Sequence, residues 1–237
     1  MYHKDGPTFL ELMKQALVST ERGYDMIAPK FDVTPFRTPD PILEAMMETI
    51  GAPRSIDAAL DVCCGTGAAM SHLRARCRER VVGLDFSEGM LEEAKRRVAK
   101  APGDAQVELV RGDALALPFD EEFDVVTSVG AFGHIVPEDE DRFVRGIARA
   151  LKPGGRFVFA TSEMPKPTNA WWWAARSFNA VMRVRNALIK PEFIMYYLTF
   201  TWPEVKPLMD RWFSRVECLK NRVPAPYDRT VLVVGTK

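Results

Sequence analysis

The sequence predicts an α/β protein with a doubly wound, mostly parallel sheet that carries helices on both of its faces. From residue 58 onward, short apolar runs alternate with segments whose apolar residues recur at helical spacing. Strands and helices that alternate in this way form right-handed crossover units, because parallel neighbours need a long connection. The first run ends on Asp61 and leads through the turn Gly65-Thr66-Gly67 into a helix, which is typical of a ligand-binding corner.

The alternation gives a range for each element. The expected strands cover residues 58–62, 80–85, 106–110, 123–129, 156–161, 214–219 and 229–235. Helices are expected at residues 67–78, 87–100 and 138–151, with Lys152-Pro153-Gly154-Gly155 closing the last one, and a further helix restarts at Thr201. A chain of 237 residues with this organisation is expected to form one domain over residues 1–237.

Residues 1–51 precede the alternation and are expected to form lid helices. Thr8 and Glu11 have the spacing of a capping box, and apolar residues follow them at helical spacing. Asp40 is the expected N-cap of a second helix, Pro41 its first residue, and Gly51 its end.

Residues 162–202 interrupt the alternation and are expected to form an aromatic-rich cap over the sheet edge. Residues 170–189 can be drawn as a helix with two faces. One stripe carries Arg176, Asn179, Arg183, Asn186 and Lys190. The opposite side carries Trp171, Ala174, Ala175, Phe178, Met182 and Leu188. We interpret the polar stripe as a solvated face and the aromatic residues as core packing, an acceptor pocket or a membrane contact.

The composition excludes several classes of function. Lys and Arg together number 32, as do Asp and Glu, and the pI of about 6.8 gives no basic excess for binding nucleic acid. No window of about 18 uncharged apolar residues predicts a transmembrane segment, and the first residues show no secretory signal. The four cysteines lack metal-ligand spacing, so we expect no metal site and reduced thiols in the cytoplasm.

Three predicted strands end at acidic residues on the same edge of the sheet. Asp61, Asp85 and Asp113 follow the first, second and third runs, where doubly wound sheets bind ligands. Asp85 lies 18 residues after Gly67, where a carboxylate can accept two hydrogen bonds from a ribose diol. Asp61, at the glycine corner, would lie near a positively charged group of the ligand. Together the three acids favour an adenosine that carries a cationic amino-acid tail over one that carries a pyrophosphate.

The surroundings of Asp113 favour the same choice. Its carboxylate could accept from an adenine amine while the Ala114 N–H meets a ring nitrogen, and Phe86 and Leu115 would sandwich the base. A dinucleotide fingerprint requires a third glycine where this sequence has Met70. An NAD-dependent oxidoreductase is therefore the less favoured alternative.

Five segments follow one another along the chain: LDVCCGTG, VVGLDFSEGML, RGDALALPF, FDVVTSVGAFGHI and LKPGGRFVFA. Together they resemble the motifs of class I S-adenosylmethionine-dependent methyltransferases, and most closely the small-molecule enzymes of ubiquinone and menaquinone biosynthesis. The likeness covers about residues 55–161 and the last two strands, and Cys63 stands where the family has its first glycine. The family fold implies a Rossmann-like sheet of seven strands in the order 3-2-1-4-5-7-6, the last antiparallel.

The resemblance also implies roles for individual residues. The backbone around Cys63, Gly65 and Val129 would contact the methionine part of S-adenosylmethionine. Tyr24 and Arg37, in the lid, would approach the methionine tail, where an Arg can offer paired donors to a carboxylate. The predicted cofactor-binding residues are Tyr24, Arg37, Asp61, Cys63, Gly65, Gly67, Asp85, Phe86, Met90, Asp113, Ala114, Leu115 and Val129.

The implied reaction is methyl transfer from S-adenosylmethionine to a small, apolar or aromatic acceptor, with S-adenosylhomocysteine as product. His134, just beyond the fourth strand, is the candidate catalytic base, and a purely structural role is also open to it. The protein as a whole could instead be a catalytically silent partner subunit that binds the cofactor, or a peripheral membrane enzyme. The peripheral membrane enzyme is suggested by residues 164–191, which carry basic side chains and no acidic side chain.

Overall fold

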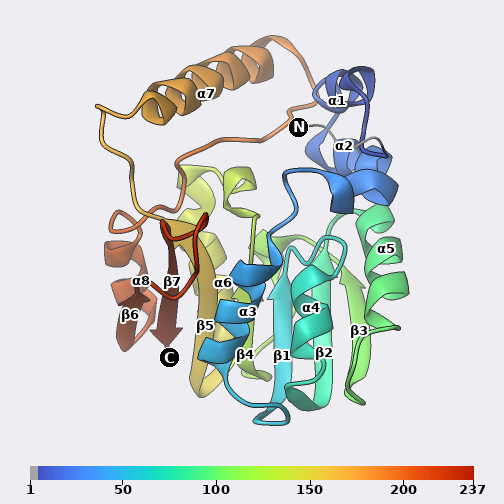
Figure 1. The fold of residues 1–237 in the computed structure, drawn as a ribbon, viewed down its shortest axis with the longest axis vertical. Helices are drawn as coiled ribbons and strands as arrows, with labels where there is room; N and C mark the ends of the chain where they lie inside the picture. Colours follow the sequence, from blue (N-terminus) through green and yellow to red (C-terminus); the bar gives the residue numbers. More distant parts are fainter. Residues whose placement is uncertain (1–4) are drawn as a thin grey trace.

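The computed structural model describes residues 5–237, and a seven-stranded sheet forms its centre (Figure 1). The strands are β1 (Ile56–Val62), β2 (Cys77–Asp85), β3 (Gln106–Arg111), β4 (Phe123–Ser128), β5 (Leu151–Ser162), β6 (Arg215–Leu219) and β7 (Thr230–Thr236). Their order is β3-β2-β1-β4-β5-β7-β6, and only β7 runs antiparallel to its neighbours. The predicted fold class and strand order are confirmed. The first four residues of the expected lid segment lie outside the described residues.

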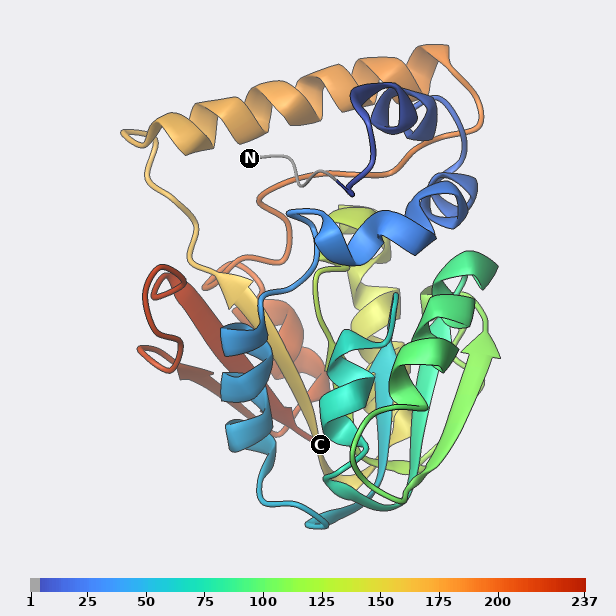
Figure 2. The ribbon, with the colours of Figure 1, turned by 45° about the vertical axis from the view of Figure 1, so that its right-hand side comes forward.

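Helices cover both faces of the sheet, so the molecule has three layers (Figures 1 and 2). One face carries α3 (Asp40–Ile50), α4 (Ala68–Leu73) and α5 (Glu88–Val98), and the other carries α6 (Glu140–Ala150) and α8 (Lys206–Trp212). Successive strand residues point to opposite faces, so Leu60 belongs to the core under α6 and Ala59 to the core under α3 and α4.

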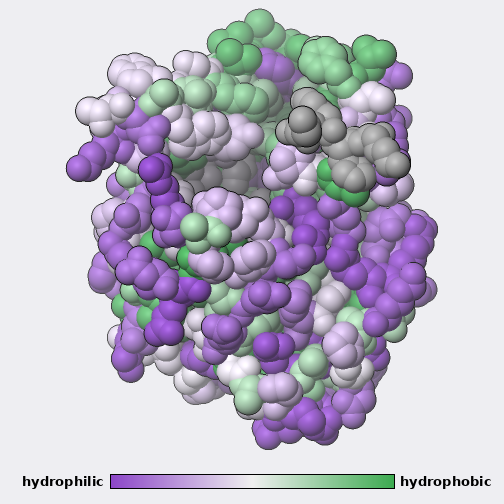
Figure 3. All heavy atoms as spheres, viewed as in Figure 1, coloured by the Kyte–Doolittle hydropathy of each residue, from purple (hydrophilic) through white to green (hydrophobic). Residues whose placement is uncertain are grey.

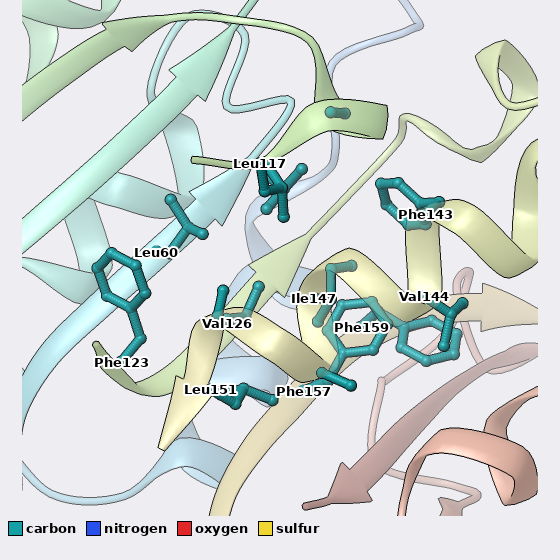
Figure 4. Packing of buried hydrophobic residues seen from close by; sticks show 14 of the residues in the cluster. Leu60, Leu117, Phe123, Val126, Phe143, Val144, Ile147, Leu151, Phe157 and Phe159 are labelled. Carbon is teal, nitrogen blue, oxygen red and sulfur yellow. The ribbon is translucent and has the colours of Figure 1, made fainter. Parts of the chain in front are cut away.

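The core under α6 illustrates how these layers are held together. Phe143, Val144 and Ile147 recur at helical spacing and are fully buried. Figure 4 shows them beside Phe157 and Phe159 of β5. Burial of this apolar stripe fixes the helix on the sheet.

A second group of helices lies at the carboxyl ends of the parallel strands. It contains α1 (Phe9–Gln15), α2 (Thr20–Ile27), the 3₁₀ helix η1 (Ala28–Val33) and α7 (Ala170–Leu188). Figures 1 and 2 both show α7 lying across this edge, with α1 beside one end of it. The capping box of α1 is confirmed: the Glu11 amide donates to Thr8 Oγ1 at 3.3 Å, and the Thr8 amide donates to Glu11 Oε2 at 2.6 Å. Three further 3₁₀ helices are η2 (Ala114–Ala116), η3 (Phe132–His134) and η4 (Pro137–Asp139).

Some expected boundaries are wrong by a few residues. α4 ends at Leu73 and not at residue 78, because the chain already enters β2 at Cys77. The N-cap of α3 is Pro39, so Asp40 is its first helical residue. α3 also falls within the segment 1–51, yet its apolar face packs on the sheet.

The orientation of α7 agrees with the expected one only in part: Ala175 and Met182 are buried and Arg176 and Arg183 are exposed, as expected, but other positions differ. Asn186, which we expected on a solvated stripe, is buried, while Leu188, expected on the packed side, is exposed. The reason is a pair of side-chain clamps on a neighbouring extended segment. Asn186 bonds both the N–H and the C=O of Phe193, at 3.0 and 3.1 Å, and Asn179 bonds both groups of Tyr197, each at 2.8 Å. No helix within residues 5–237 is long and apolar enough to cross a membrane.

Candidate functional site

The glycine corner after β1 is the floor of the site. Cys63, Gly65 and Gly67 all have positive φ, at +57°, +51° and +76°. Gly67 leaves no room for a side chain, because an added Cβ would lie 2.9 Å from Val98 of α5. Cys63 adopts a conformation that favours glycine, which explains why the resembling family has glycine at this position.

Asp85, at the end of β2, is joined to this corner. Its buried carboxylate accepts from the amide of Gly65 and from the amide of Ser87, each at 2.9 Å. Burial raises the pKa of Asp85, and these backbone donors act against that rise. A carboxylate can accept about four hydrogen bonds, so Asp85 keeps acceptor capacity for a hydroxyl group in the cavity.

Asp61 lies one strand away and is also buried. Its carboxylate accepts from Thr127 Oγ1 at 2.7 Å, because β1 and β4 pair with Asp61 opposite Thr127. Burial raises the pKa of Asp61 to about 7, and the nearby charge of Asp85 adds to the rise. Two buried carboxyl groups at one site suit a cationic ligand, and this chemistry fits the sulfonium and ammonium groups of S-adenosylmethionine.

A cavity opens over these acids and beneath the lid, with about 780 Å³ of empty space including its mouth. Ten of the fourteen predicted site residues line it: Tyr24, Arg37, Asp61, Cys63, Gly65, Asp85, Phe86, Met90, Val129 and His134. The structure therefore brings most of the predicted residues together around one cavity.

The other four predicted residues lie outside the lining of this cavity. Gly67 faces α5, and the other three follow β3. Asp113 is exposed and accepts from the amide of Leu115 at 2.8 Å, which caps η2, and Ala114 is the first residue of that turn. Adenine recognition by Asp113, Ala114 and Leu115 stays a prediction.

The lid supplies residues that sequence reasoning missed. Phe31, Phe36 and Thr38 line the cavity from the lid side, and Gly130 lines it from the loop after β4. The lid segment has no clear periodicity, so only its aromatic content could have drawn attention to Phe31 and Phe36. Arg37, which was predicted, also bonds Asp40 at 2.5 Å, and this bond holds the pKa of Asp40 below its usual value.

Two acids in the lid fasten it to the sheet domain and were also missed. Asp25 accepts from Ser87 Oγ at 2.6 Å and from the amide of Gly89 at 3.0 Å, at the start of α5. Asp32 accepts from Thr66 Oγ1 at 2.7 Å and pairs with Arg97. The lid is therefore closed over the cavity in this structure.

His134 has hydrogen-bond partners on both ring nitrogens. Nδ1 lies 2.5 Å from the carbonyl oxygen of Ile194, which can only accept, so Nδ1 carries the proton. Nε2 then accepts from the Tyr24 hydroxyl at 2.7 Å. Burial lowers the pKa of His134, which favours the neutral ring, and burial raises the pKa of Tyr24, which keeps its hydroxyl protonated.

The sheet order, the glycine corner and the strand-end acids define a Rossmann-like protein that binds a nucleotide cofactor. A family described as a methyltransferase domain matches residues 59–155. Demethylmenaquinone methyltransferase from Staphylococcus aureus (strain MRSA252) is 36% identical over 186 residues, 75% of this chain and 74% of that protein. The enzyme of the same name from Clavibacter sepedonicus is 42% identical over 118 residues, 48% of this chain and 46% of that protein.

Solved structures share the fold. The DhpI–SAH complex aligns with a TM-score of 0.64 at 18% sequence identity, covering 96% of this chain and 97% of that one. The chain belongs to the class I S-adenosylmethionine-dependent methyltransferases, and the predicted family and cofactor are confirmed. An oxidoreductase and a catalytically silent subunit find no support in these similarities. The chain spans about half the length of several curated relatives that it matches.

Proposed function

We propose that the protein transfers a methyl group from S-adenosylmethionine to a small, apolar or aromatic acceptor in the cytoplasm. The observation that carries the proposal is the pair of buried carboxyl groups, Asp61 and Asp85, at the glycine corner under the closed lid. When bound there, the cofactor supplies an activated methyl group on a positively charged sulfur. The free cysteines of the described chain agree with a reducing compartment.

The lid side of the cavity supports an apolar or aromatic acceptor. Phe31, Phe36 and Tyr24 give this wall its aromatic character, and the ring of Tyr24 packs at a right angle to that of His134, 5.1 Å between centroids. Rings of this kind bind flat, apolar molecules well. The names of the relatives make reduced demethylmenaquinone the first acceptor to test.

The chain's own residues would contribute mainly by positioning and by removing one proton. Holding an acceptor in line with the methyl group can account for up to roughly 7–11 kcal/mol of the barrier. An acceptor that gains a methyl group on carbon or oxygen must release a proton. Tyr24 is placed to receive this proton on its oxygen while its own hydroxyl proton passes to Nε2 of His134. The carbonyl of Ile194 accepts from Nδ1 and so holds the imidazole ring in place.

Calorimetric titration with S-adenosylmethionine, S-adenosylhomocysteine and NAD tests the cofactor site directly. We expect micromolar binding of the first two and none of NAD. Asp85→Ala should abolish binding, because the ribose loses its acceptor and the amide of Gly65 loses its partner. Asp120→Ala, which removes an exposed carboxylate before β4, is the matched control and should bind as the parent does. Unchanged affinity in Asp85→Ala would contradict the proposed site.

Turnover with reduced demethylmenaquinone, followed as S-adenosylhomocysteine formed, tests the acceptor and the proton path. His134→Ala should lower kcat by about 10²–10⁴-fold with little change in cofactor affinity. Tyr24→Phe should also lower kcat, because the relay loses its hydroxyl. In the parent, kcat should fall as the pH drops through a value below 6.5, where His134 becomes protonated. Full activity of His134→Ala would leave the residue a structural role.

A further inference from the structure

The outer face of α7 is apolar and carries no charge. Val184, Val181 and Leu188 are 59%, 65% and 78% exposed, and they lie on the side opposite the buried Ala175, Met182 and Asn186. Alanine and serine residues fill the positions between them on this outer side. A helix whose apolar stripe points away from the protein lacks the partner that normally covers it.

α1 extends this apolar surface. Phe9 and Leu10 are each 70% exposed, and Met13 and Leu17 are exposed on the same part of the lid. The two segments are joined, because Arg185 of α7 donates to the carbonyls of Ala16 and Val18, at 2.8 and 3.4 Å. Figure 3 shows hydrophobic residues gathered along the end of the molecule that α7 and α1 form, while the opposite end is mostly hydrophilic.

Basic side chains border this surface. Residues 164–191 contain five basic residues and no acidic residue; of these, Lys190 pairs with Glu192 and Arg185 bonds backbone carbonyls. Arg176 and Arg183 lie on one flank of α7, and both are exposed. The guanidinium of Arg176 lies 4.7 Å from the ring centre of Trp172, and exposed Trp173 lies beside it. Apolar residues bordered by cations and tryptophans are typical of helices that lie in the interface of an anionic bilayer.

From these observations we propose that the outer face of α7 and α1 docks on an anionic lipid bilayer. The charge pattern favours a lipid surface over a second copy of this chain, because a second copy would place its own basic residues next to the basic residues of the first. Docking would turn the closed lid and cap towards the membrane. The inference does not depend on the proposed function, because vesicle binding can be measured without cofactor or acceptor.

Co-sedimentation with vesicles tests the docking face. We expect the protein to pellet with an equal mixture of phosphatidylglycerol and phosphatidylcholine, and much less with phosphatidylcholine alone or at high salt. The variant Val181→Ser, Val184→Ser, Leu188→Ser should bind the mixed vesicles about tenfold or more weakly. Arg176→Gln with Arg183→Gln should weaken binding to the mixed vesicles and not to the neutral ones. Arg185 is left unchanged in both variants, because it holds α1.

Lys95→Gln with Lys100→Gln is the matched control, since it removes two exposed cations near the C-terminal end of α5 and should pellet as the parent does. Binding of S-adenosylhomocysteine by every variant shows that the fold is kept. A parent protein that stays in the supernatant with mixed vesicles would overturn the proposal, as would a triple-serine variant that pellets equally well. Sedimentation velocity without vesicles tests whether this face instead binds a second copy of the chain. A parent protein that is a dimer, together with a triple-serine variant that is a monomer, would assign the face to a second copy and overturn the proposal.

Discussion

α6 and α7 both contain apolar side chains, but α6 buries its apolar face, whereas α7 also exposes one that carries Val181, Val184 and Leu188. In α6, Phe143 and Ile147 point to the sheet and are fully buried, and arginines face solvent. In α7, the asparagines Asn179 and Asn186 point to the protein, and the exposed apolar residues point away from it. The sheet layers are therefore held by apolar burial, whereas the cap is held by hydrogen bonds together with a few buried apolar side chains such as Ala175 and Met182. A helix can thus be fixed in place while its apolar face remains available.

The largest effect should come from the region held by apolar burial. Phe143→Ala removes a ring that packs against Phe132 and Phe200 at the centre of the core. We expect a loss of about 3–5 kcal/mol in the free energy of unfolding, measured by urea denaturation. A loss below about 1 kcal/mol would mean that α6 is not held as the buried stripe indicates.

The hydrogen-bonded cap should be less sensitive. Asn186→Ala leaves the buried N–H and C=O of Phe193 without their side-chain partner, and should cost about 1–3 kcal/mol in the same measurement. Asn179→Ala removes the matching pair of hydrogen bonds to Tyr197, which is half-buried. It should lower the free energy of unfolding by less, because water can replace the lost bonds there. Equal stability of Asn186→Ala and the parent would remove the distinction between the two regions.

Asp61, at the end of β1, should make the free energy of unfolding depend on pH. Its ordinary pKa of 3.8 is raised to about 7 in the folded protein, so the folded state holds a proton that the unfolded state has lost between these values. The stabilisation is complete below about pH 4 and is lost as the pH rises through about 7. Between pH 6 and pH 8, without cofactor, we expect the parent to lose about 1 kcal/mol more of its free energy of unfolding than Asp61→Asn does, because the variant keeps the buried histidines but lacks the carboxyl. The same pH dependence in both proteins would place the Asp61 carboxyl in a more solvated site.

The smallest effect should come from the outer face of α7. Leu188→Ala removes an exposed side chain with no partner to lose, so we expect a change within about 0.5 kcal/mol in the absence of lipid. A loss above about 1 kcal/mol in urea denaturation would show that this face is covered in solution.

The sheet could be predicted from the sequence because its signals are local. Each strand is a short apolar run, and the order of the strands followed from the resemblance of five motifs around the glycine corner. The ten predicted residues that line the cavity lie in those motifs or in the lid next to them. Strand-end acids such as Asp61 and Asp85 meet at one edge because parallel strands end together.

The parts that could not be predicted depend on contacts between distant segments. Helical spacing predicted the burial of Ala175 and Met182, but it did not show that Asn186 is buried and Leu188 is exposed. Those positions depend on Asn179 and Asn186, which bond residues 193–197. The fastening of the lid by Asp25 and Asp32 is equally non-local, since their partners lie more than 30 residues away in sequence. For Asp113, the local bond to Leu115 leaves adenine recognition as a prediction.

The imidazole of His134 is one of several contacts that join the loop after β4, the lid and the segment beside α7, and Arg185 and Thr20 make others. The ring belongs to the loop after β4, receives the Tyr24 hydroxyl from the lid, and donates to Ile194 beside the cap helix. Swinging the lid away from the cavity breaks the first of these bonds and frees a ring that also anchors the segment under α7. We therefore expect opening of the lid for cofactor exchange to loosen the cap as well.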